Sequence, residues 1–480
     1  MHLHTLPRSI KNILIYAISL LLTKGTSLIM LPIITNHFTP NQLGKLEILV
    51  TTSMFLCLLS GFAMHENLYR FVGCLKDPKY RFEKASEIYS TSLILSTSMA
   101  ILIASFLFMF PHINRMLSKI EILLVCLVLC FETALSISTA WLRLQDKAFT
   151  LLIINTLSCL IQLAGIFLIL RISPNITLFY MVGVASTFLQ LALLQFINRF
   201  QWNFGKFEEL KKLLSYSTPL MLSTMITFGL TGAEKWIIGY SISMESLGLY
   251  SISAKFSLAM CILVQPFCMW WIPKRFQVLS EKGKSYTIKI TQCGLVYIVL
   301  SAIFVTYISQ IFIQSALPKS YYDACYLVIG TIFISLLKEI SNLINIGILN
   351  SKKTQWMLKI DLVCTSLGLY LCWIMSLHGV WGILLSIMLA QILRVSLVFY
   401  CSQLLEPLPY QYCALAAILL VTITCLWLNF TVKSFFPLTV ILIFGIVTNL
   451  AISYYSAFFT SISIISIRNA FSKRLEVNDV

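Results

Sequence analysis

The sequence predicts an all-α polytopic membrane protein with about fourteen transmembrane helices. Of its 480 residues, 58% are hydrophobic and only 11% are charged, whereas soluble domains carry about 25% charged residues. The apolar residues gather in segments of roughly the 20 residues that a helix needs to cross a membrane. The connections between these segments are too short to hold a folded soluble domain.

The expected spans follow one another closely along the chain. The weakly basic N-terminus leads into an apolar segment without a small-residue cleavage site, so we interpret that segment as a retained first span. The spans are expected near residues 11–35, 45–70, 85–110, 119–142, 149–171, 176–199, 213–240, 246–272, 287–316, 322–349, 355–377, 379–404, 411–431 and 436–462.

Lysine and arginine predict the orientation. With the N-terminus in the cytoplasm, 24 of them lie near cytoplasmic span ends and 6 near outer ends, which is the positive-inside pattern. An even number of spans returns the C-terminus to the cytoplasm, with Arg468, Lys473 and Arg474. Topology therefore accounts for most of the net charge of +16, and nucleic-acid binding is not needed to explain it.

Two pairs of segments indicate an internal repeat. TPNQLGKLEILVTTSMFL at 39–56 resembles SMESLGLYSISAKFSLAM at 243–260, and LRLQDKAFTLLIIN at 142–155 resembles ILNSKKTQWMLKID at 348–361. The offsets are nearly equal, which suggests a duplicated six-helix unit in parallel orientation. We expect one lobe over residues 1–200, a second over 201–405, and two further helices with a cytoplasmic tail over 406–480.

Polar side chains form stripes inside several expected spans. In the fourth span, Glu132, Ser136, Thr139 and Arg143 follow the spacing of one helix face. Such stripes face a protein interior or water rather than lipid. The sequence therefore predicts a polar central cavity. The 14 cysteines lie mostly in apolar segments without a C-x-x-C motif, and we interpret them as packing residues.

Three cations lie deep in their spans, without an adjacent acid in the sequence: Lys24, Lys255 and Arg394. For these we favour a function over a structural role. Buried cations suit phosphate or carboxylate, and hydroxyl and amide side chains suit sugars. We therefore expect an anionic, hydroxyl-rich substrate.

Other charged residues have structural alternatives. Glu66 and Arg70, four residues apart, would also suit an ion pair on a helix surface. Lys338 and Glu339 would also suit contacts with neighbouring helices, and Asp361 would suit a place near the cytoplasmic interface.

An ordered set of segments resembles the oligosaccharide flippases of polysaccharide biosynthesis, in the superfamily that also holds MATE transporters and peptidoglycan-precursor flippases. The set covers most of residues 11–404. The segments are KNILIYAISLLLTKGTSLIMLPIITNHFTPNQLGKLEIL, GFAMHENLYRF, WLRLQDKAF, FEELKKLLSYSTPLMLS, EKWIIGY, SLGLYSISAKFS, LPKSYYDA, INIGILNSKKTQ and HGVWGILLSIMLAQILR.

The resemblance implies two six-helix lobes around a V-shaped cavity, alternating access, and an undecaprenyl-diphosphate-linked oligosaccharide as substrate. It places Lys24, Arg70, Lys235 and Lys255 at basic positions of the family. At Glu234-Lys235 the family commonly has Asp-Arg, and a lysine loses the bidentate geometry for phosphate. Together with Lys338 and Arg394, these cations form our predicted substrate-binding set.

The expected mechanism has no catalytic residue, metal or cofactor. A gradient of protons or sodium, or the membrane potential, would drive the cycle, with Glu66, Glu132, Glu234, Glu339 and Asp361 as candidate coupling carboxylates. We expect a monomer in the bacterial cytoplasmic membrane that contacts membrane lipids, and a glycan polymerase or glycosyltransferases of the same pathway as partners.

Two other function classes remain open. A MATE-like, ion-coupled small-molecule exporter would share the fold but would have a cavity dominated by acids and aromatic residues. A membrane enzyme such as a glycan polymerase would need a substantial outer loop, and the expected outer loops are short. The sequence lacks a Gly-rich phosphate-binding motif, which argues against direct use of ATP.

Overall fold

The computed structural model describes residues 8–73, 75–109, 117–203, 207–351, 353–432, 434–456 and 458. These residues form helices and connections, without a strand among them. The chain forms two compact units, Met1–Gly248 and Leu249–Val480. The expected lobe limits, 1–200 and 201–405, stay a prediction. They come from a sequence repeat, whereas the two units are defined by their compactness. The expected tail with Arg468, Lys473 and Arg474 lies outside the described residues.

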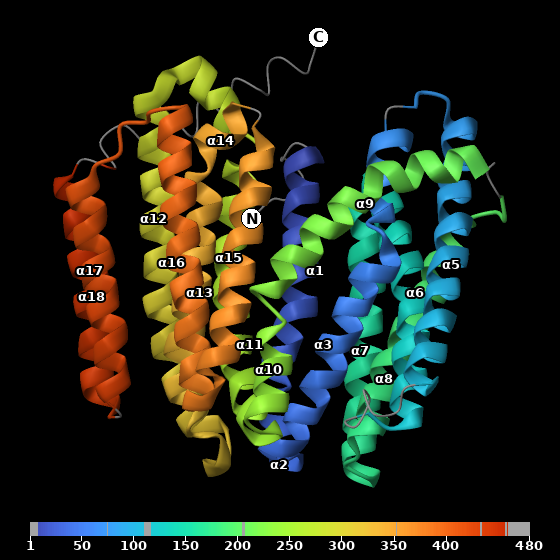
Figure 1. Ribbon diagram of the computed structural model, residues 1–480, viewed down its shortest axis with the longest axis horizontal. Coiled ribbons are helices and arrows are strands. Elements are labelled where there is room, and N and C mark those ends of the chain that lie inside the picture. The colour runs from blue at the N-terminus through green and yellow to red at the C-terminus, as the bar shows by residue number, and fades with distance from the viewer. Residues whose placement is uncertain are drawn as a thin grey trace. The chain divides into compact units, whose positions relative to one another are not determined.

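Figure 1 shows the helices of both units. Those that lie in unit 1 are α1 (Arg8–Ile29), α2 (Leu31–His37), α3 (Pro40–Gly61), α4 (Met64–Asn67), the π-helix η2 (Leu68–Val72), α5 (Pro78–Met109), α6 (Lys119–Leu144), α7 (Ala148–Ile172), α8 (Ile176–Asn198), α9 (Phe207–Gly229) and α10 (Glu234–Ser241). The next helix, α11 (Met244–Trp271), begins in unit 1 and continues in unit 2. Unit 2 also holds α12 (Arg275–Ala316), η3 (Lys319–Tyr321), α13 (Ala324–Ile344), α14 (Ile346–Asn350), α15 (Thr354–Met375), η4 (Ser376–His378), α16 (Gly379–Leu405), α17 (Tyr412–Thr431) and α18 (Phe435–Tyr455).

Two helices of unit 1 begin with capping boxes. The Thr39 side chain accepts a hydrogen bond from the Gln42 backbone, and the Gln42 side chain accepts one from the Thr39 backbone. Ser118 and Glu121 do the same at α6. Each box satisfies two backbone donors that a helix N-terminus otherwise leaves unpaired. The starts of α3 and α6 are therefore determined locally by the sequence.

The described helices include 11 that are long and apolar enough to cross a membrane, or up to 12 if the bent pair α9–α10 counts as one span. The polytopic all-α fold is thus confirmed, whereas the expected number of fourteen is not. One reason for the difference is that α15 and α16 count as a single segment, Thr354–Leu405.

Two expected spans are interrupted. The span expected at 45–70 ends early because Phe62 and Ala63 both have left-handed φ angles, 43° and 47°, which continue no right-handed helix. The chain resumes as α4 and η2. The span expected at 213–240 bends by 45° between α9 and α10. Such breaks interrupt the regular hydrogen-bond pattern of a helix, which membrane proteins tolerate where the backbone is buried in protein or lines a cavity.

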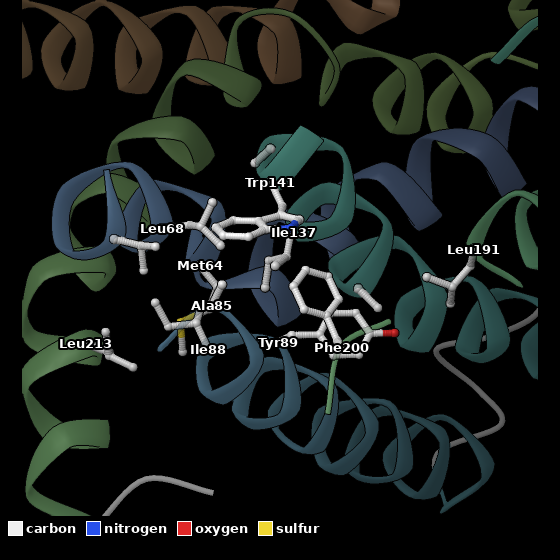
Figure 2. Close-up of a cluster of buried hydrophobic side chains, with 13 residues drawn as sticks. Met64, Leu68, Ala85, Ile88, Tyr89, Ile137, Trp141, Leu191, Phe200 and Leu213 are labelled. Atoms are coloured by element: carbon white, nitrogen blue, oxygen red, sulfur yellow. The ribbon is translucent and has the colours of Figure 1, made fainter. Parts of the chain in front are cut away.

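An aromatic core holds one end of unit 1 together (Figure 2). Arg199 ends α8 in a left-handed conformation, with φ at 52°, and the turn carries Phe200 back into the helices. The Phe200 ring stacks on Tyr89 with centroids 4.6 Å apart and contacts Trp141. This core joins α5, α6 and the chain that leads into α9.

In unit 2, the two C-terminal helices pack on a long central helix. α17 and α18 contact each other, and both contact α12. α12 itself contains a break at Gly283, whose φ of 79° is non-helical. α15 and α16 also pack against each other, and this contact positions two of the predicted charged residues.

Two glycines at equivalent repeat positions meet in unit 1. A Cβ on Gly44 would lie 1.9 Å from the carbonyl oxygen of Met244, and one on Gly248 would lie 1.9 Å from that of Pro40. Each glycine thus contacts the residue four positions before the other glycine. Two copies of a duplicated helix form such a symmetric contact when they cross. Only glycine permits the two backbones to approach so closely.

We expect Gly44→Ala to lower the free energy of unfolding by about 1–3 kcal/mol, because the added methyl group overlaps the Met244 backbone. Gly25→Ala is the matched control, since a Cβ on Gly25 has no neighbour within 4 Å. Thermal unfolding of the purified variants in detergent measures both. Equal melting temperatures for the two variants would contradict the close backbone contact between α3 and α11.

Candidate functional site

The EKWIIGY segment forms α10, which packs along α3 in unit 1. Lys235 Nζ lies 2.6 Å from Glu47 Oε1. Trp236 Nε1 donates to Thr52 Oγ1 at 3.1 Å, and its ring meets Phe55 edge to face at 5.1 Å. The described partner of Lys235 is therefore a carboxylate on another helix.

Glu47 is a residue that our sequence analysis did not identify. Its side chain is 14% exposed and that of Lys235 is 16% exposed, so the pair is well shielded from water. Its position could have identified it as a candidate, since Glu47 lies in LGKLEIL, three residues after Gly44 and within a repeated segment. Glu234, the acid expected to act with Lys235, is itself buried at the start of α10.

Arg394 and Asp361 form a second shielded ion pair, in unit 2. Arg394 Nε donates to Asp361 Oδ1 at 2.7 Å, and their side chains are 6% and 15% exposed. The pair joins α16 to α15. It brings together one residue predicted to bind substrate and one predicted to couple ions. A charge in a low-dielectric interior needs such a partner, so the pair gives Arg394 a structural role as well.

Lys24 is placed differently. It lies in α1, and its side chain is exposed. The opposite face of α1 packs on α7, where Asn155 Nδ2 donates to Ser19 Oγ at 2.9 Å and Thr26 Oγ1 lies 3.1 Å from Cys159 Sγ. At ~100° per residue, Lys24 points roughly 140–160° away from both contacts. Among the described residues, no carboxylate forms an ion pair with it.

The remaining predicted cations have mixed surroundings. Arg70, in η2, is exposed, and within the described ranges no ion pair joins it to Glu66; instead Glu66 lies 3.4 Å from the His65 ring. Lys255 and Lys338 are half-buried in unit 2. Cys261 of α11 is near both Lys338 and Glu339. Three of the six predicted cations lie in unit 1 and three in unit 2, and their assigned roles stay predictions.

Unit 1 contains a cavity of about 500 Å³ that holds Glu132. Ser136 of the same predicted stripe also lines it, whereas Thr139 and Arg143 are not among its lining residues. Tyr180 reaches in from α8 and hydrogen-bonds Ser53 of α3. Within the part of the chain that the structure describes, no cation forms an ion pair with Glu132. A carboxylate in such a cavity can take up a proton or a cation.

Further ion pairs occur towards helix ends of unit 1. Lys84 bonds Glu87 at 2.7 Å and Glu209 at 2.9 Å, which ties α5 to α9. Lys45 bonds Glu121 at 3.1 Å, which joins α3 to the capping box of α6. The lysine count that predicts the topology includes both residues. Glu87 is only three positions from Lys84, a spacing typical of ion pairs on a helix. Glu209 and Glu121 are distant in the sequence from their lysines, so no local pattern indicates those two contacts.

In unit 2, Arg275 at the start of α12 is buried. It donates to Asn345 Oδ1 at 2.9 Å and to the Asn342 carbonyl at 3.3 Å. These acceptors lie at the C-terminal end of α13, where free carbonyls and the helix dipole favour a cation. Arg275 therefore has a structural role at the break between α13 and α14.

We expect Lys235→Ala or Glu47→Ala to destabilise the protein by ~3–5 kcal/mol, because each leaves a shielded charge without its partner. The double variant Lys235→Met with Glu47→Leu should recover most of that loss. Thermal unfolding in detergent gives the comparison. If the single and double variants are equally destabilised, the pair contributes no mutual stabilisation.

Comparisons with known proteins place the chain in a family. The family model described as polysaccharide biosynthesis protein matches residues 9–279. No curated protein sequence matches the chain. The fold is similar to that of the lipid II flippase MurJ in its inward closed conformation, with a TM-score of 0.71, 14% identity, and coverage of 94% of this chain and 99% of that chain.

Two other solved structures are similar in fold. An inward-facing multidrug resistance MATE transporter has a TM-score of 0.56 and 12% identity, with 80% of this chain and 93% of that chain covered. A MOP superfamily transporter from Pyrococcus furiosus has a TM-score of 0.51 and 13% identity, with 86% and 98% covered. At such identities the likeness concerns the fold alone. The family match spans more than half of the chain, and the protein therefore belongs to the polysaccharide biosynthesis protein family.

Proposed function

We propose that this protein is a flippase that moves an undecaprenyl-diphosphate-linked oligosaccharide across the bacterial cytoplasmic membrane by alternating access. The glycan would be a unit of O-antigen, capsule or exopolysaccharide. The family match and the fold shared with a lipid II flippase support a lipid-linked substrate. The N- and C-termini would lie in the cytoplasm, as the positive-inside pattern predicts.

The placement of Lys24 carries this proposal. Lys24 lies 16 residues after Arg8 and 13 residues before His37, roughly 20–25 Å from either end of α1 and α2 taken together. Where the expected first span crosses the membrane, a lysine at this position would be too far from either interface to reach it easily. Since its side chain is exposed on the face away from α7, it requires water or an anion. The diphosphate of a lipid-linked glycan supplies such an anion.

The other cations would have separate parts. Arg70, also exposed, would meet the diphosphate at the cytoplasmic end. Lys235 and Arg394 hold carboxylates in the described structure, so they would contact substrate only after exchanging partners. The protein would make and break no covalent bond, and glycosyltransferases or a polymerase of the same pathway would act before and after it.

In cells that lack the wild-type gene, we expect Lys24→Gln to leave lipid-linked glycan on the cytoplasmic leaflet, at least about tenfold above wild type, because it removes the proposed charge contact with phosphate. Lys24→Arg should restore part of the clearance. Lys79→Gln, on an exposed lysine of α5, is the matched control. Glycan analysis with leaflet-specific labelling reads the result, and normal clearance by Lys24→Gln would contradict the assigned role.

We further propose that Glu132 couples flipping to a proton or sodium gradient. Its cavity in unit 1 is lined by aliphatic and aromatic side chains, by hydroxyl and amide groups, and by the titratable ring of His65, without a lysine or arginine among the lining residues. A carboxylate in this setting can alternate between a neutral and a charged state, and the difference is large in a low dielectric. Binding of one proton or cation would thereby favour one conformation over the other.

Glu132→Gln should abolish the response of flipping to an imposed gradient, because glutamine keeps the shape of the side chain but binds no proton. The measurement is flipping in vesicles, with the pH gradient and the sodium gradient varied separately. Glu208→Gln, at an exposed carboxylate of α9, is the control. A gradient response in Glu132→Gln equal to that of wild type would exclude Glu132 as the coupling residue.

The same cavity favours a second function, a MATE-like exporter of small cations. Such an exporter needs acidic and aromatic side chains around its substrate, and Glu132, Tyr180 and Phe228 supply them. Cells that lack the protein discriminate between the two functions. Increased sensitivity to small cationic compounds with unchanged lipid-linked glycan would support the exporter, whereas accumulated glycan with unchanged sensitivity would support the flippase.

A further inference from the structure

Unit 2 contains a second cavity, which none of the predicted substrate-binding or ion-coupling residues line. It has a volume of about 260 Å³ and lies where α12 ends, α13 begins and α17 ends. The positive-inside pattern predicts that this end of unit 2 is on the outer side. Drug-sized ligands occupy pockets of about 300–1,000 Å³, so this cavity suits a smaller group, of the size of one sugar residue.

The cavity is lined by side chains that both donate and accept hydrogen bonds. Gln310 and Gln314 come from α12, Asp323 precedes α13, and Asn429 comes from α17. Gln310 Nε2 donates to the Cys325 carbonyl at 2.8 Å, which fixes the orientation of this buried amide. An amide offers two donors and an acceptor, a combination that matches sugar hydroxyls, each of which is donor and acceptor at once.

Asn429 has an unused acceptor. Its side chain is 3% exposed, and its Nδ2 donates to the Cys425 carbonyl of its own helix at 2.8 Å. Its Oδ1 accepts no hydrogen bond from any described residue. Leaving a buried acceptor unsatisfied costs about 1–3 kcal/mol. A ligand hydroxyl would satisfy it once the side chains that cover this oxygen move apart.

Aromatic rings supply the apolar side of the same cavity. Phe430 and Tyr326 line it, and their rings lie edge to face with centroids 5.3 Å apart. Trp381 supports Phe430 from behind at 5.6 Å. A sugar ring presents C–H groups on its faces and hydroxyls around its edge. An aromatic side next to amides matches that distribution.

The charge of the cavity decides between possible ligands. Its lining includes the carboxylate of Asp323 and no lysine or arginine. A phosphate or diphosphate would meet repulsion there. A neutral sugar residue would not, because its hydroxyls can donate to the carboxylate.

We propose that this cavity of unit 2 is a binding site for one neutral sugar residue of the glycan on the outer side of the membrane. The inference rests on the proposed flippase function and extends it. The site would hold the glycan while the diphosphate dissociates from the lysine and arginine side chains that bind it. It would thereby favour release of the lipid-linked glycan on the outer side.

The test measures sugar binding to the full-length protein in lipid nanodiscs by saturation-transfer NMR. The probes are glucose, galactose and N-acetylglucosamine, with inorganic phosphate as the anionic competitor. We expect at least one sugar to bind with millimolar affinity and phosphate not to displace it. Asn429→Leu should weaken binding about tenfold, the equivalent of one lost hydrogen bond.

Asn449→Leu is a closely matched control. Asn449 in α18 also donates Nδ2 to its own helix, at 2.8 Å from the Gly445 carbonyl, and its buried Oδ1 also lacks a described partner. It does not line the cavity. Both substitutions replace an amide whose oxygen lacks a described partner and whose Nδ2 bonds to its own helix. We therefore expect both to change the melting temperature to the same extent, and only Asn429→Leu to weaken sugar binding.

The outcomes are distinct. The proposal is overturned if wild type binds none of the three sugars, if both leucine variants bind as wild type does, or if phosphate displaces the sugar. Clearance of lipid-linked glycan in cells is measured on the same wild-type protein. Clearance without sugar binding removes this site alone, whereas failure of clearance removes the proposed function and the assignment of the site to a flipped glycan.

Discussion

The cost of placing a charge inside a membrane is the constraint on which this structure depends. Most of its helices are apolar enough to span a bilayer, so any lysine, arginine or carboxylate within them needs a partner or water. Lys235 with Glu47 and Arg394 with Asp361 satisfy this need by pairing across helices. Lys24 and Glu132 have no such described ion pair. Within the described residues, this contrast divides the charges inside the helices into those with an ion-pair partner and those without one.

The pairing in unit 1 depends in turn on close backbone packing. Gly44 and Gly248 let the starts of α3 and α11 approach to a distance that any side chain would prevent. The short helix α10 precedes this crossing in the chain and lies along α3. Lys235 contacts Glu47, Trp236 contacts Thr52, and Gly239 lies close to Ile48. The glycine pair of the repeat and the contacts of α10 thus lie along the same helix, α3.

Much of the fold could be predicted from the sequence because membrane burial imposes a simple pattern. Apolar length indicated the helices, and ordered motifs indicated the family. The breaks were harder to predict. Phe62 and Ala63 are ordinary residues in helices, and only their surroundings explain their left-handed conformation. The number of candidate spans differs from fourteen at other places, since α9 and α10 form one bent pair and α15 and α16 count as one segment.

The candidate site was less predictable, for a physical reason. An ion pair between helices depends on which faces meet, and one sequence does not contain that information. Glu47 was missed because its partner Lys235 is 188 positions away. Arg394 looked unpaired because Asp361 is 33 positions away. Glu132 was found, since a stripe with helical spacing is a local signal, and two of its four members do line the cavity.

The central claim is that the protein moves a lipid-linked glycan, and transport by the purified protein tests it most directly. Liposomes would contain undecaprenyl-diphosphate-linked oligosaccharide in both leaflets, and a membrane-impermeant glycan-cleaving enzyme would be added outside. With the protein present, the account predicts that glycan of both leaflets becomes cleavable. Cleavage limited to the outer-leaflet share, equal to that of protein-free liposomes, would contradict it.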